Sequence, residues 1–205
     1  MTDEMNQVWE LMYKNGKGNM FPEPLVIRFI KRNFEGVKQL NCRALEVGCG
    51  FGAHTLFLAE NGIEVSALDV SESSLAFLKK EAKRRKLNNI STFNMPIEQF
   101  DTPKNHFDLV LDINCLQHIY RDSLTQTLEK LEQSIKPQGW LYSWFISDSK
   151  NLNDETFYLS NLTKEDFKKY FKTSFDMKFD EYRYTENNSK DHIAFTIFAA
   201  QKKIL

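Results

Sequence analysis

The chain has 205 residues and a formal net charge of −1, with 41% hydrophobic and 27% charged residues. This composition is typical of an ordinary globular protein of about one domain. A net charge near zero creates no overall field that would attract nucleic acid or anionic lipid. We therefore expect neither of these as a partner.

The cysteines predict neither a disulfide framework nor a metal site. Cys42, Cys49 and Cys115 are odd in number and lack the spacing of metal ligands. The N-terminus has no signal-peptide pattern, and no apolar run approaches the roughly 20 residues that span a bilayer. We expect a cytoplasmic protein without a metal, as a monomer or a homodimer.

Two helices are expected before the first strand. Residues 3–14 place apolar side chains at helical spacing, and Pro22 and Pro24 can start a second helix. Residues 15–19 are rich in Gly and Asn and separate the two. We expect residues 1–40 to form a helical cap over the sheet edge or over the mouth of a ligand site.

Strands and helices alternate over residues 41–146, the expected cofactor-binding core, which is typical of an α/β fold with a parallel sheet. Phe107–Ile113 has an unbroken apolar stretch that indicates a strand buried on both faces. The predicted strands are 44–47, 64–68, 90–93, 107–113 and 140–146, and the predicted helices are 53–61, 71–86 and 123–135. Ser71 is the expected N-cap of its helix, and Pro137-Gln138-Gly139 is expected to turn the chain into the last of these strands.

Residues 147–205 have a different pattern. A short helix is expected over 163–171, followed by strand-like runs over 175–184 and 192–201 on either side of a polar turn. Such a turn predicts a hairpin with antiparallel strands. Because no repeat or linker composition interrupts the chain, we predict one domain over residues 1–205.

The most informative motif follows the first predicted strand, 44–47. Gly48, Gly50 and Gly52 occupy alternate positions just before a helix start. Glycine allows positive φ and lets a ligand lie directly against the main chain. The second predicted strand leads to Asp69. Together these features predict a βαβ unit that binds a nucleoside.

The glycines alone do not identify the ligand, because Gly48-x-Gly50-x-x-Ala53 also fits the dinucleotide fingerprint. Glu46 is more informative. Its carboxylate would repel a pyrophosphate by about 4 kcal/mol at 4 Å in a moderately screened site, whereas it would attract an ammonium group. S-adenosylmethionine has an ammonium group and no phosphate. Asp69 can accept hydrogen bonds from both ribose hydroxyls of either ligand. An alternative is that both acids are merely solvated strand ends.

At these residues the chain resembles the class I S-adenosylmethionine-dependent methyltransferases, over roughly residues 40–146. The motifs that carry the resemblance occur in the expected order: 45–52, 65–71, 107–111, 116–119 and 135–140. The resemblance implies a doubly wound, seven-stranded, mostly parallel sheet with a C-terminal antiparallel hairpin and helices on both faces. The N-terminal segment resembles the small-molecule branch that includes tellurite-resistance and thiopurine-type enzymes, through Trp9, Tyr13, Gly16 and Phe21-Pro22.

The resemblance also implies S-adenosyl-L-methionine as the cofactor and S-adenosyl-L-homocysteine as the product. Gly48, Gly50 and Gly52 would line its methionine and ribose portion, and Glu46 would order its amino group. Asp69 would hold the ribose hydroxyls.

The adenine end departs from the family pattern, because Pro96 stands where an adenine-binding Asp is usual. Val70 would pack on the adenine. Asn94 or a backbone carbonyl would replace the missing hydrogen bond, or apolar contacts with Met95 and Ile97 would hold the base.

Two further residues complete the implied cofactor site. Asp112 lies near the end of the fourth predicted strand, at the position that faces the transferable methyl group. Tyr13 would close over the cofactor, although it also fits an apolar core stripe.

The predicted reaction is in-line transfer of the methyl group to O, N or S of a small molecule. His118 is the candidate general base, because imidazole titrates near neutral pH. The alternative is a packing histidine, and the same alternative applies to His54. Two other functions stay open. One is an NAD(P)-dependent oxidoreductase, and the other is a catalytically silent protein that binds S-adenosylmethionine. The basic residues within 79–86 are expected on a solvated helix face.

Overall fold

The computed structural model describes residues 3–34, 41–148, 159–160, 162–171, 173–185 and 192–204. The contacts divide the chain into two compact units, Thr2–Phe100 and Asp101–Leu205. We call them the N-terminal and the C-terminal unit.

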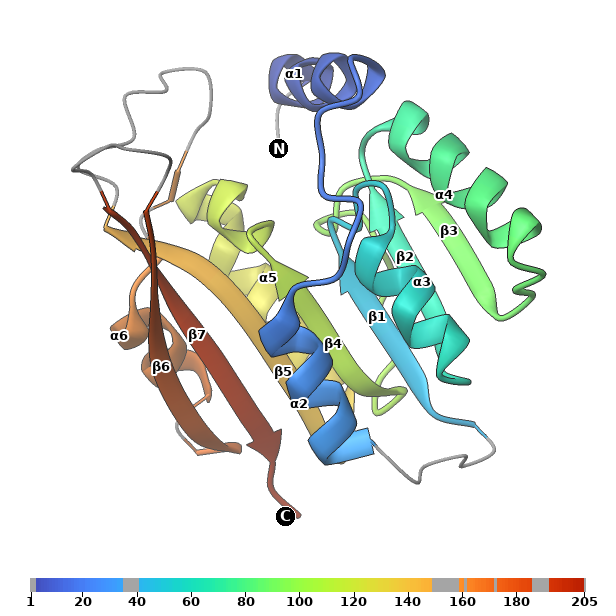
Figure 1. Cartoon of the computed structure of the whole chain (residues 1–205). Helices are drawn as coiled ribbons and strands as arrows, with labels where there is room; N and C mark the ends of the chain where they lie inside the picture. The colour runs from blue at the N-terminus through green and yellow to red at the C-terminus, as the bar shows by residue number, and fades with distance from the viewer. Residues whose placement is uncertain are drawn as a thin grey trace. The chain divides into compact units, whose positions relative to one another are not determined.

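The N-terminal unit is built from two helices followed by a βαβαβ segment (Figure 1). Its elements are α1 (Asp3–Lys14), α2 (Pro24–Phe34), β1 (Arg43–Val47), α3 (Ala53–Glu60), β2 (Glu64–Asp69), α4 (Glu72–Arg84) and β3 (Ile90–Asn94). The strands are parallel in the order β3-β2-β1. Both α3 and α4 contact β2, the middle strand. The carboxyl ends of all three strands therefore meet at one edge, where a doubly wound sheet binds its ligand.

The C-terminal unit contains the remaining strands. Its elements are β4 (Phe107–Ile113), the 3₁₀ turn η1 (Leu116–His118), α5 (Arg121–Ser134), β5 (Ile135–Asp148), α6 (Lys164–Phe171), β6 (Phe175–Thr185) and β7 (His192–Lys202). The strand order is β4-β5-β7-β6. The β4–β5 pair is parallel, and β7 runs antiparallel to both β5 and β6.

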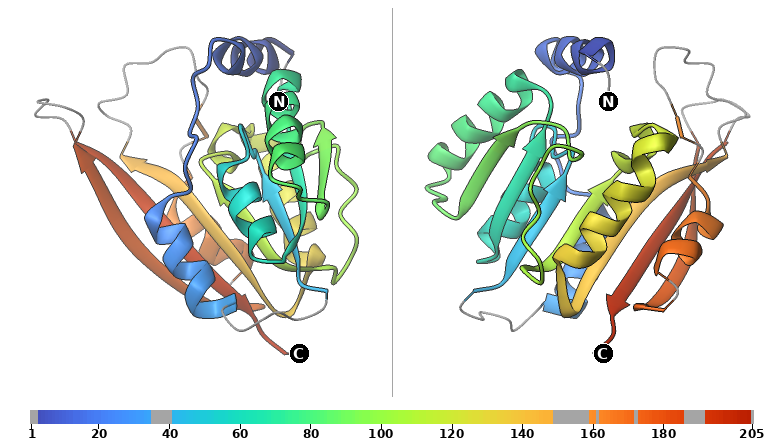
Figure 2. Two further views of the ribbon diagram at one scale, coloured as in Figure 1. Left: turned by 45° about the vertical axis from the view of Figure 1, so that its right-hand side comes forward. Right: turned by 180° about the vertical axis from the view of Figure 1, so that it is seen from behind.

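One face of the C-terminal unit's strands is covered by α5 and α6, which contact each other (Figure 2, right). Aromatic rings form the core on this face. The Phe167 ring centroid lies 5.0 Å from that of Phe145 and 4.5 Å from that of Phe198. All three side chains are fully buried. Alternate residues of β5 and β7 point to the other face, and among them are Tyr142, Trp144 and Phe195.

The predicted fold class is confirmed: the protein is α/β, and its described residues form seven strands that are mostly parallel, with a C-terminal antiparallel hairpin. The first three predicted strands match the observed ones to within one residue at each end. Ser71 is the N-cap of α4, and its hydroxyl accepts a hydrogen bond from Ser74 N at 3.1 Å. The predicted polar turn of the hairpin lies outside the described residues.

Several boundaries differ from the prediction by two residues or more. Helix α4 ends at Arg84, two residues before its predicted end, and β5 ends at Asp148, two residues after its predicted end. Helix α5 begins at Arg121, two residues before the predicted start. Strand β5 begins at Ile135, because the segment predicted as a turn is an irregularity inside the strand. The pairing with β4 passes from Phe107–Ile135 to Leu109–Trp140, and Gln138 adopts a φ of 66° within this interval. The extra residues on one strand form a bulge.

Candidate functional site

The glycine turn after β1 has the backbone that the sequence predicts. Gly48, Gly50 and Gly52 have φ values of 69°, 51° and 79°, in the region that favours glycine. The turn is closed by a hydrogen bond from Gly52 N to Cys49 O at 2.8 Å. A Cβ atom on Gly50 would lie 2.6 Å from Tyr13 Oη, so the tyrosine side chain lies directly against the turn.

Asp69, at the end of β2, binds the same turn through its side chain. It is 6% exposed; its Oδ2 accepts from Gly50 N at 2.7 Å and its Oδ1 from Ser71 N at 2.9 Å. Burial raises the pKa of this carboxyl group, while the hydrogen bonds from Ser71 and Gly50 oppose the shift. Asp69 therefore connects the glycine turn to the start of α4 and is not a solvated strand end.

Glu46, near the end of β1, is also buried, at 2% exposure. Its Oε1 lies 3.2 Å from His54 Nδ1, and its Oε2 accepts a short hydrogen bond from the Thr55 hydroxyl. The second ring nitrogen of His54, Nε2, accepts from Glu23 N at 3.2 Å. The alternative of a solvated strand end is excluded for Glu46 too. Sequence reasoning missed the link to His54, although its place in the first turn of α3, just past the glycines, was a usable signal.

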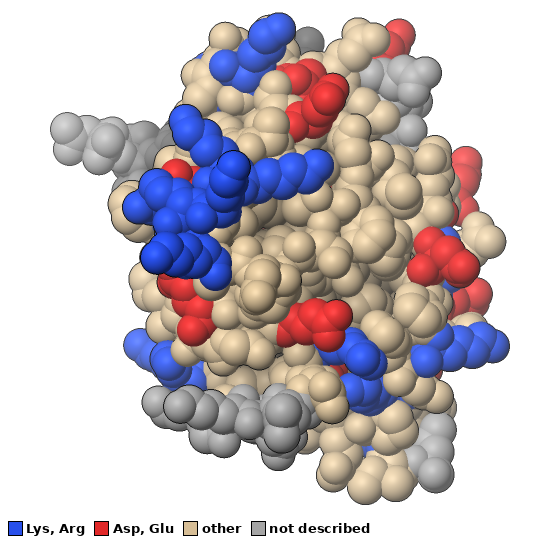
Figure 3. Space-filling model, turned by 90° about the vertical axis from the view of Figure 1, so that its right-hand side faces the viewer, with Lys and Arg blue, Asp and Glu red and all other residues tan. Residues whose placement is uncertain are grey.

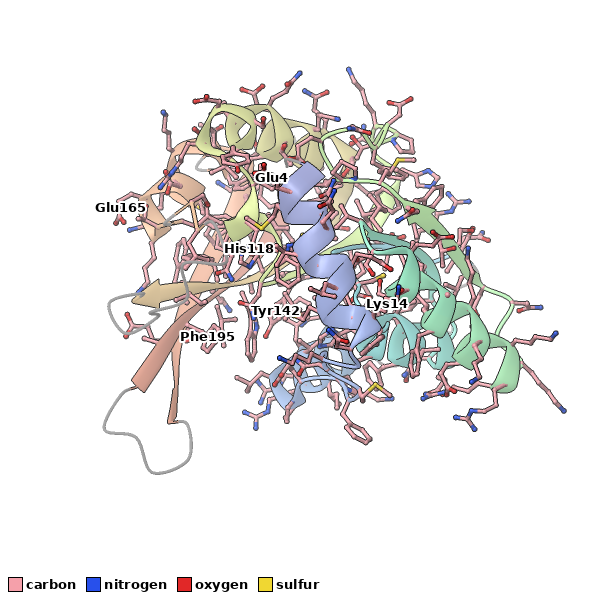
Figure 4. The ribbon with its side chains drawn as sticks, turned by 90° about the horizontal axis from the view of Figure 1, so that it is seen from above. Glu4, Lys14, His118, Tyr142, Glu165 and Phe195 are labelled. Carbon is pink, nitrogen blue, oxygen red and sulfur yellow. The ribbon has the colours of Figure 1, made fainter. Side chains whose placement is uncertain are left out.

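Helix α1 lies across the N-terminal end of α4 (Figures 1 and 2). Glu10 makes the contact: its carboxylate accepts from the Ser71 hydroxyl at 2.6 Å, from Ser73 N at 3.1 Å, and from the Ser73 hydroxyl. These bonds, that from Ser71 first, lower the pKa of Glu10. We call this cluster the Glu10 latch. Figure 4 looks down on α1, with Glu4 and Lys14 near its two ends.

The Glu10 latch keeps the face of α1 that carries Tyr13 against the glycine turn. The Tyr13 ring packs edge-on against Phe51 at 5.1 Å between centroids, and it stacks with Trp9 at 6.3 Å. Sequence reasoning identified Tyr13 as a residue that would close over the cofactor but did not identify Glu10. An isolated acid on a surface helix gives no local signal of its partner.

The predicted adenine side follows β2 and β3. Ile97 is buried, while Val70 and Met95 are half-buried. The Asn94 side-chain amide donates to Asp69 O at 3.1 Å and to Val70 O at 2.9 Å. Because both amide hydrogens have backbone acceptors, Asn94 holds the turn after β2. The Asn94 amide oxygen keeps acceptor capacity for an adenine amino group, so both predicted ways to hold an adenine stay predictions.

Asp112 lies near the end of β4, in the C-terminal unit, and is fully buried. Its Oδ1 accepts from Cys115 N at 2.9 Å and Leu116 N at 3.0 Å, and its Oδ2 accepts from the Ser143 hydroxyl. Burial raises its pKa to about 6. Through these contacts the Asp112 carboxyl group holds the start of η1. The cofactor contact implied by the resemblance stays a prediction.

His118 ends η1 and is buried. Its Nε2 lies 3.4 Å from Gln117 Nε2, and Gln117 Oε1 accepts from Ile146 N at 2.8 Å. Tyr142 and Phe195 come from β5 and β7, on the face opposite the Phe145 core (Figure 4). The His118 ring is thus placed by its neighbour on η1, and its role as a base stays a prediction.

The basic residues within 79–86 lie on the last turns of α4 and just beyond its end, and they gather on one face of the molecule (Figure 3). All the lysines and arginines in this range are exposed, as predicted. Arg84 and Arg85 form ion pairs with Glu81 and Glu60 at 2.8 Å and 2.9 Å. This is a solvated helix face whose charge is partly balanced locally.

In the part of the chain that the structure describes, no helix combines the length and apolar character needed to cross a membrane. The same residues contain no group of three or more His, Cys, Asp or Glu side chains arranged to hold a metal ion.

Comparison with known proteins shows which protein family and which relatives this chain is similar to. A family model described as Methyltransferase domain matches residues 44–139. A relative from Haemophilus influenzae, named "Probable S-adenosyl-L-methionine-dependent methyltransferase TehB", is 24% identical over 79% of this chain and 58% of its own length. A Ubiquinone biosynthesis O-methyltransferase from Bradyrhizobium diazoefficiens is 30% identical over 70% of this chain and 59% of its own length.

A solved structure with a similar fold comes from the same group of relatives. The crystal structure of TehB from Haemophilus influenzae superposes with a TM-score of 0.72 at 20% identity, covering 95% of this chain and 67% of that one. The chain spans less than two thirds of the length of the two curated relatives. The matched segment, 44–139, contains the glycine turn, Glu46 and Asp69.

Proposed function

The chain belongs to the class I S-adenosylmethionine-dependent methyltransferase family, and we propose that it transfers a methyl group from S-adenosyl-L-methionine to O, N or S of a small molecule. The observation that carries the proposal is the pair of buried carboxylates on either side of the glycine turn, 2% exposed at Glu46 and 6% at Asp69. A buried carboxylate is stabilised by a cationic or hydrogen-bonding partner.

The surroundings of Glu46 fit the amino end of this cofactor. Its described side-chain partners are an imidazole nitrogen and a hydroxyl group. The imidazole is neutral when its Nε2 accepts a hydrogen bond, as it does here from Glu23 N. The carboxylate thus lacks a cation among its described contacts. An α-ammonium group would supply that charge, whereas a pyrophosphate would add a repulsive one.

Asp69 would hold the ribose. Each of its oxygens accepts one backbone N–H and keeps further acceptor capacity for a ribose hydroxyl. Gly50 admits the ligand against the main chain, and the Tyr13 ring beside it would exclude water from the sulfonium end. Val70, Met95 and Ile97 would contact the adenine. S-adenosylmethionine, when bound, supplies an electrophilic methyl group, so the protein mainly has to orient an acceptor.

Features of the C-terminal unit support the proposal that the methyl acceptor is a small molecule. The face of β5 and β7 that carries Tyr142, Trp144 and Phe195 is aromatic, with the Trp144 and Phe195 rings 6.3 Å apart. His118 would accept a proton from an acceptor that carries one. The basic face of α4 is solvated and partly ion-paired, which favours a small molecule over a polyanion. A cytoplasmic location stays a prediction.

Calorimetric titration of the purified protein with S-adenosylhomocysteine, and separately with NAD and NADP, tests the cofactor. Binding of the first alone is expected. Binding of a nicotinamide nucleotide alone would support the oxidoreductase instead, and no binding of any of them by the folded protein would refute the proposal. Measured methyl transfer to a member of a panel of thiols, amines and phenols would then exclude a catalytically silent protein.

A matched set of variants tests the ribose contact. Asp69→Ala should weaken S-adenosylhomocysteine binding by about 1–3 kcal/mol, because a charged hydrogen-bond acceptor is lost. Asp69→Asn retains the shape but replaces one acceptor oxygen with a donor that would face a backbone N–H, so it should lose affinity as well. Asp101→Ala, at an exposed acid, is the control. Unchanged affinity in Asp69→Ala with the fold intact would contradict the assignment.

A further inference from the structure

We propose that His54 is a positioning residue: as a neutral imidazole with its proton on Nδ1, it sets the orientation of the Glu46 carboxylate toward the amino end of the cofactor. The inference rests on the proposed function, since it concerns the same site. It assigns a task to a buried histidine that the methyl transfer itself does not use.

The tautomer follows from the hydrogen bonds. A backbone N–H can only donate, so His54 Nε2, 3.2 Å from Glu23 N, must be the unprotonated acceptor. A neutral ring then carries its proton on Nδ1, which lies 3.2 Å from Glu46 Oε1. The resulting chain is directional: Glu23 N–H donates to the ring, and the ring donates to the carboxylate.

The carboxylate is held from two sides. His54 donates to Oε1 and the Thr55 hydroxyl donates to Oε2, and both donors belong to the first turn of α3. The three residues are 5% exposed or less, so bulk water does not replace a lost donor freely. Because the two donors occupy one lone pair on each oxygen, they determine the direction in which the remaining lone pairs can accept an ammonium group.

The same ring ties the carboxylate to the chain that leads into α2. Glu23 immediately precedes Pro24, the first residue of α2, and residues 15–23 connect that helix to α1. Removing the ring would therefore free one carboxylate oxygen and one backbone N–H together. An unpaired buried backbone group is costly, which is why the substitution must be compared with isosteres.

Binding of two ligands distinguishes a positioning role of His54 from a purely structural one. S-adenosylhomocysteine has the amino-acid end that Glu46 would contact, whereas 5′-methylthioadenosine has the adenosine and the thioether but no amino acid. His54→Ala should weaken binding of S-adenosylhomocysteine about tenfold and leave binding of 5′-methylthioadenosine within about twofold. Glu46→Gln should show the same selective loss.

Isosteres test which nitrogen matters. In His54→Asn the side-chain amide reaches the position of Nδ1 and can still donate to Glu46, so most of the affinity for S-adenosylhomocysteine should return. In His54→Gln the amide reaches the position of Nε2 instead, and affinity should stay low. Nitrogen chemical shifts of the wild-type imidazole should report a protonated Nδ1 and an unprotonated Nε2.

The outcomes distinguish this inference from the proposed function. If the folded wild-type protein binds neither ligand, the proposed function fails and the inference fails with it. If the wild type binds both but His54→Ala weakens them equally, His54 is only structural and the inference is overturned. If His54→Ala does not fold, His54→Asn and His54→Gln are compared instead. The inference is overturned if His54→Gln binds S-adenosylhomocysteine more tightly than His54→Asn does, or if the two variants bind it equally well. It is also overturned if the wild-type imidazole carries its proton on Nε2.

Discussion

Replacing Gly50 with alanine tests how closely the first helix is joined to the glycine turn. The backbone φ of 51° lies in the region that L-residues avoid, which costs about 1–2 kcal/mol for a residue with a Cβ atom. The new Cβ would also lie 2.6 Å from Tyr13 Oη and 3.1 Å from Tyr13 Cζ. Gly50→Ala therefore combines a backbone cost with a steric one.

A second glycine isolates the backbone cost. Gly62 has a φ of 85°, and a Cβ there would meet nothing within 4 Å. Gly62→Ala should thus destabilise by the backbone term alone, about 1–2 kcal/mol. Gly50→Ala must also displace the Tyr13 ring from Phe51, and such an aromatic pair contributes about 0.5–1.5 kcal/mol. We expect a total of about 2–3 kcal/mol, or a melting temperature lower by roughly 4–12 °C for a chain of this size.

Urea unfolding of both variants, and of Gly50→Ala combined with Tyr13→Phe, measures these quantities. Tyr13→Phe removes the oxygen atom closest to the new Cβ, so the double variant should recover part of the lost stability, a coupling that a double-mutant cycle detects. Gly50→Ala should also weaken S-adenosylhomocysteine binding, whereas Gly62→Ala should not. Equal destabilisation by the two alanines, with no recovery in the double variant, would refute a close contact between Tyr13 and the turn.

Three further outcomes are expected. Glu10→Gln should speed dissociation of S-adenosylhomocysteine and lower stability by about 1 kcal/mol, measured by stopped-flow and urea unfolding; Glu4→Gln, at an exposed acid of the same helix, should do neither. The pKa of Asp112 is raised to about 6, so the folded state holds a proton that the unfolded state loses. Stability should therefore fall as the pH rises from about 4 to about 6; Asp112→Asn should flatten that slope, and an unchanged slope would contradict the burial argument. His118→Ala should remove the pH dependence of turnover if the acceptor carries a proton, and unchanged kinetics would make His118 a packing residue.

Much of the N-terminal unit was predictable because its signals are local. An apolar run followed by an acid and alternate glycines specifies a strand, a turn and a helix start within residues 44–55. The structure places Glu46 and Asp69 on either side of that turn, in buried positions. These features depend on backbone preferences and on strand register, and both can be inferred from neighbouring residues.

Contacts between distant side chains could not be predicted in the same way. Glu10 and Ser71 are separated by 61 positions, and no pattern in either segment identifies the other. Asp112 shows a second difficulty. An acid near the end of a buried strand has the same sequence pattern whether or not it also holds the following turn, and the hydrogen bonds from Cys115 N and Leu116 N to Asp112 are seen only in the structure.

Strand β5 shows a third difficulty. Pro137-Gln138-Gly139 is typical of a turn, yet the chain pairs with β4 on both sides of it. Turn residues specify a local change of direction, but whether this change ends a strand or bulges it depends on the neighbouring strand.

The placement of the two buried carboxylates has a consequence for turnover. Glu46 and Asp69 would hold the amino and ribose groups, which are common to the methyl donor and to the demethylated nucleoside that remains after transfer. Neither contact discriminates between them, so the spent molecule should compete with fresh donor at similar concentrations. Sustained catalysis would then require another reaction that removes the spent thioether, and the ratio of the two nucleosides would govern the rate.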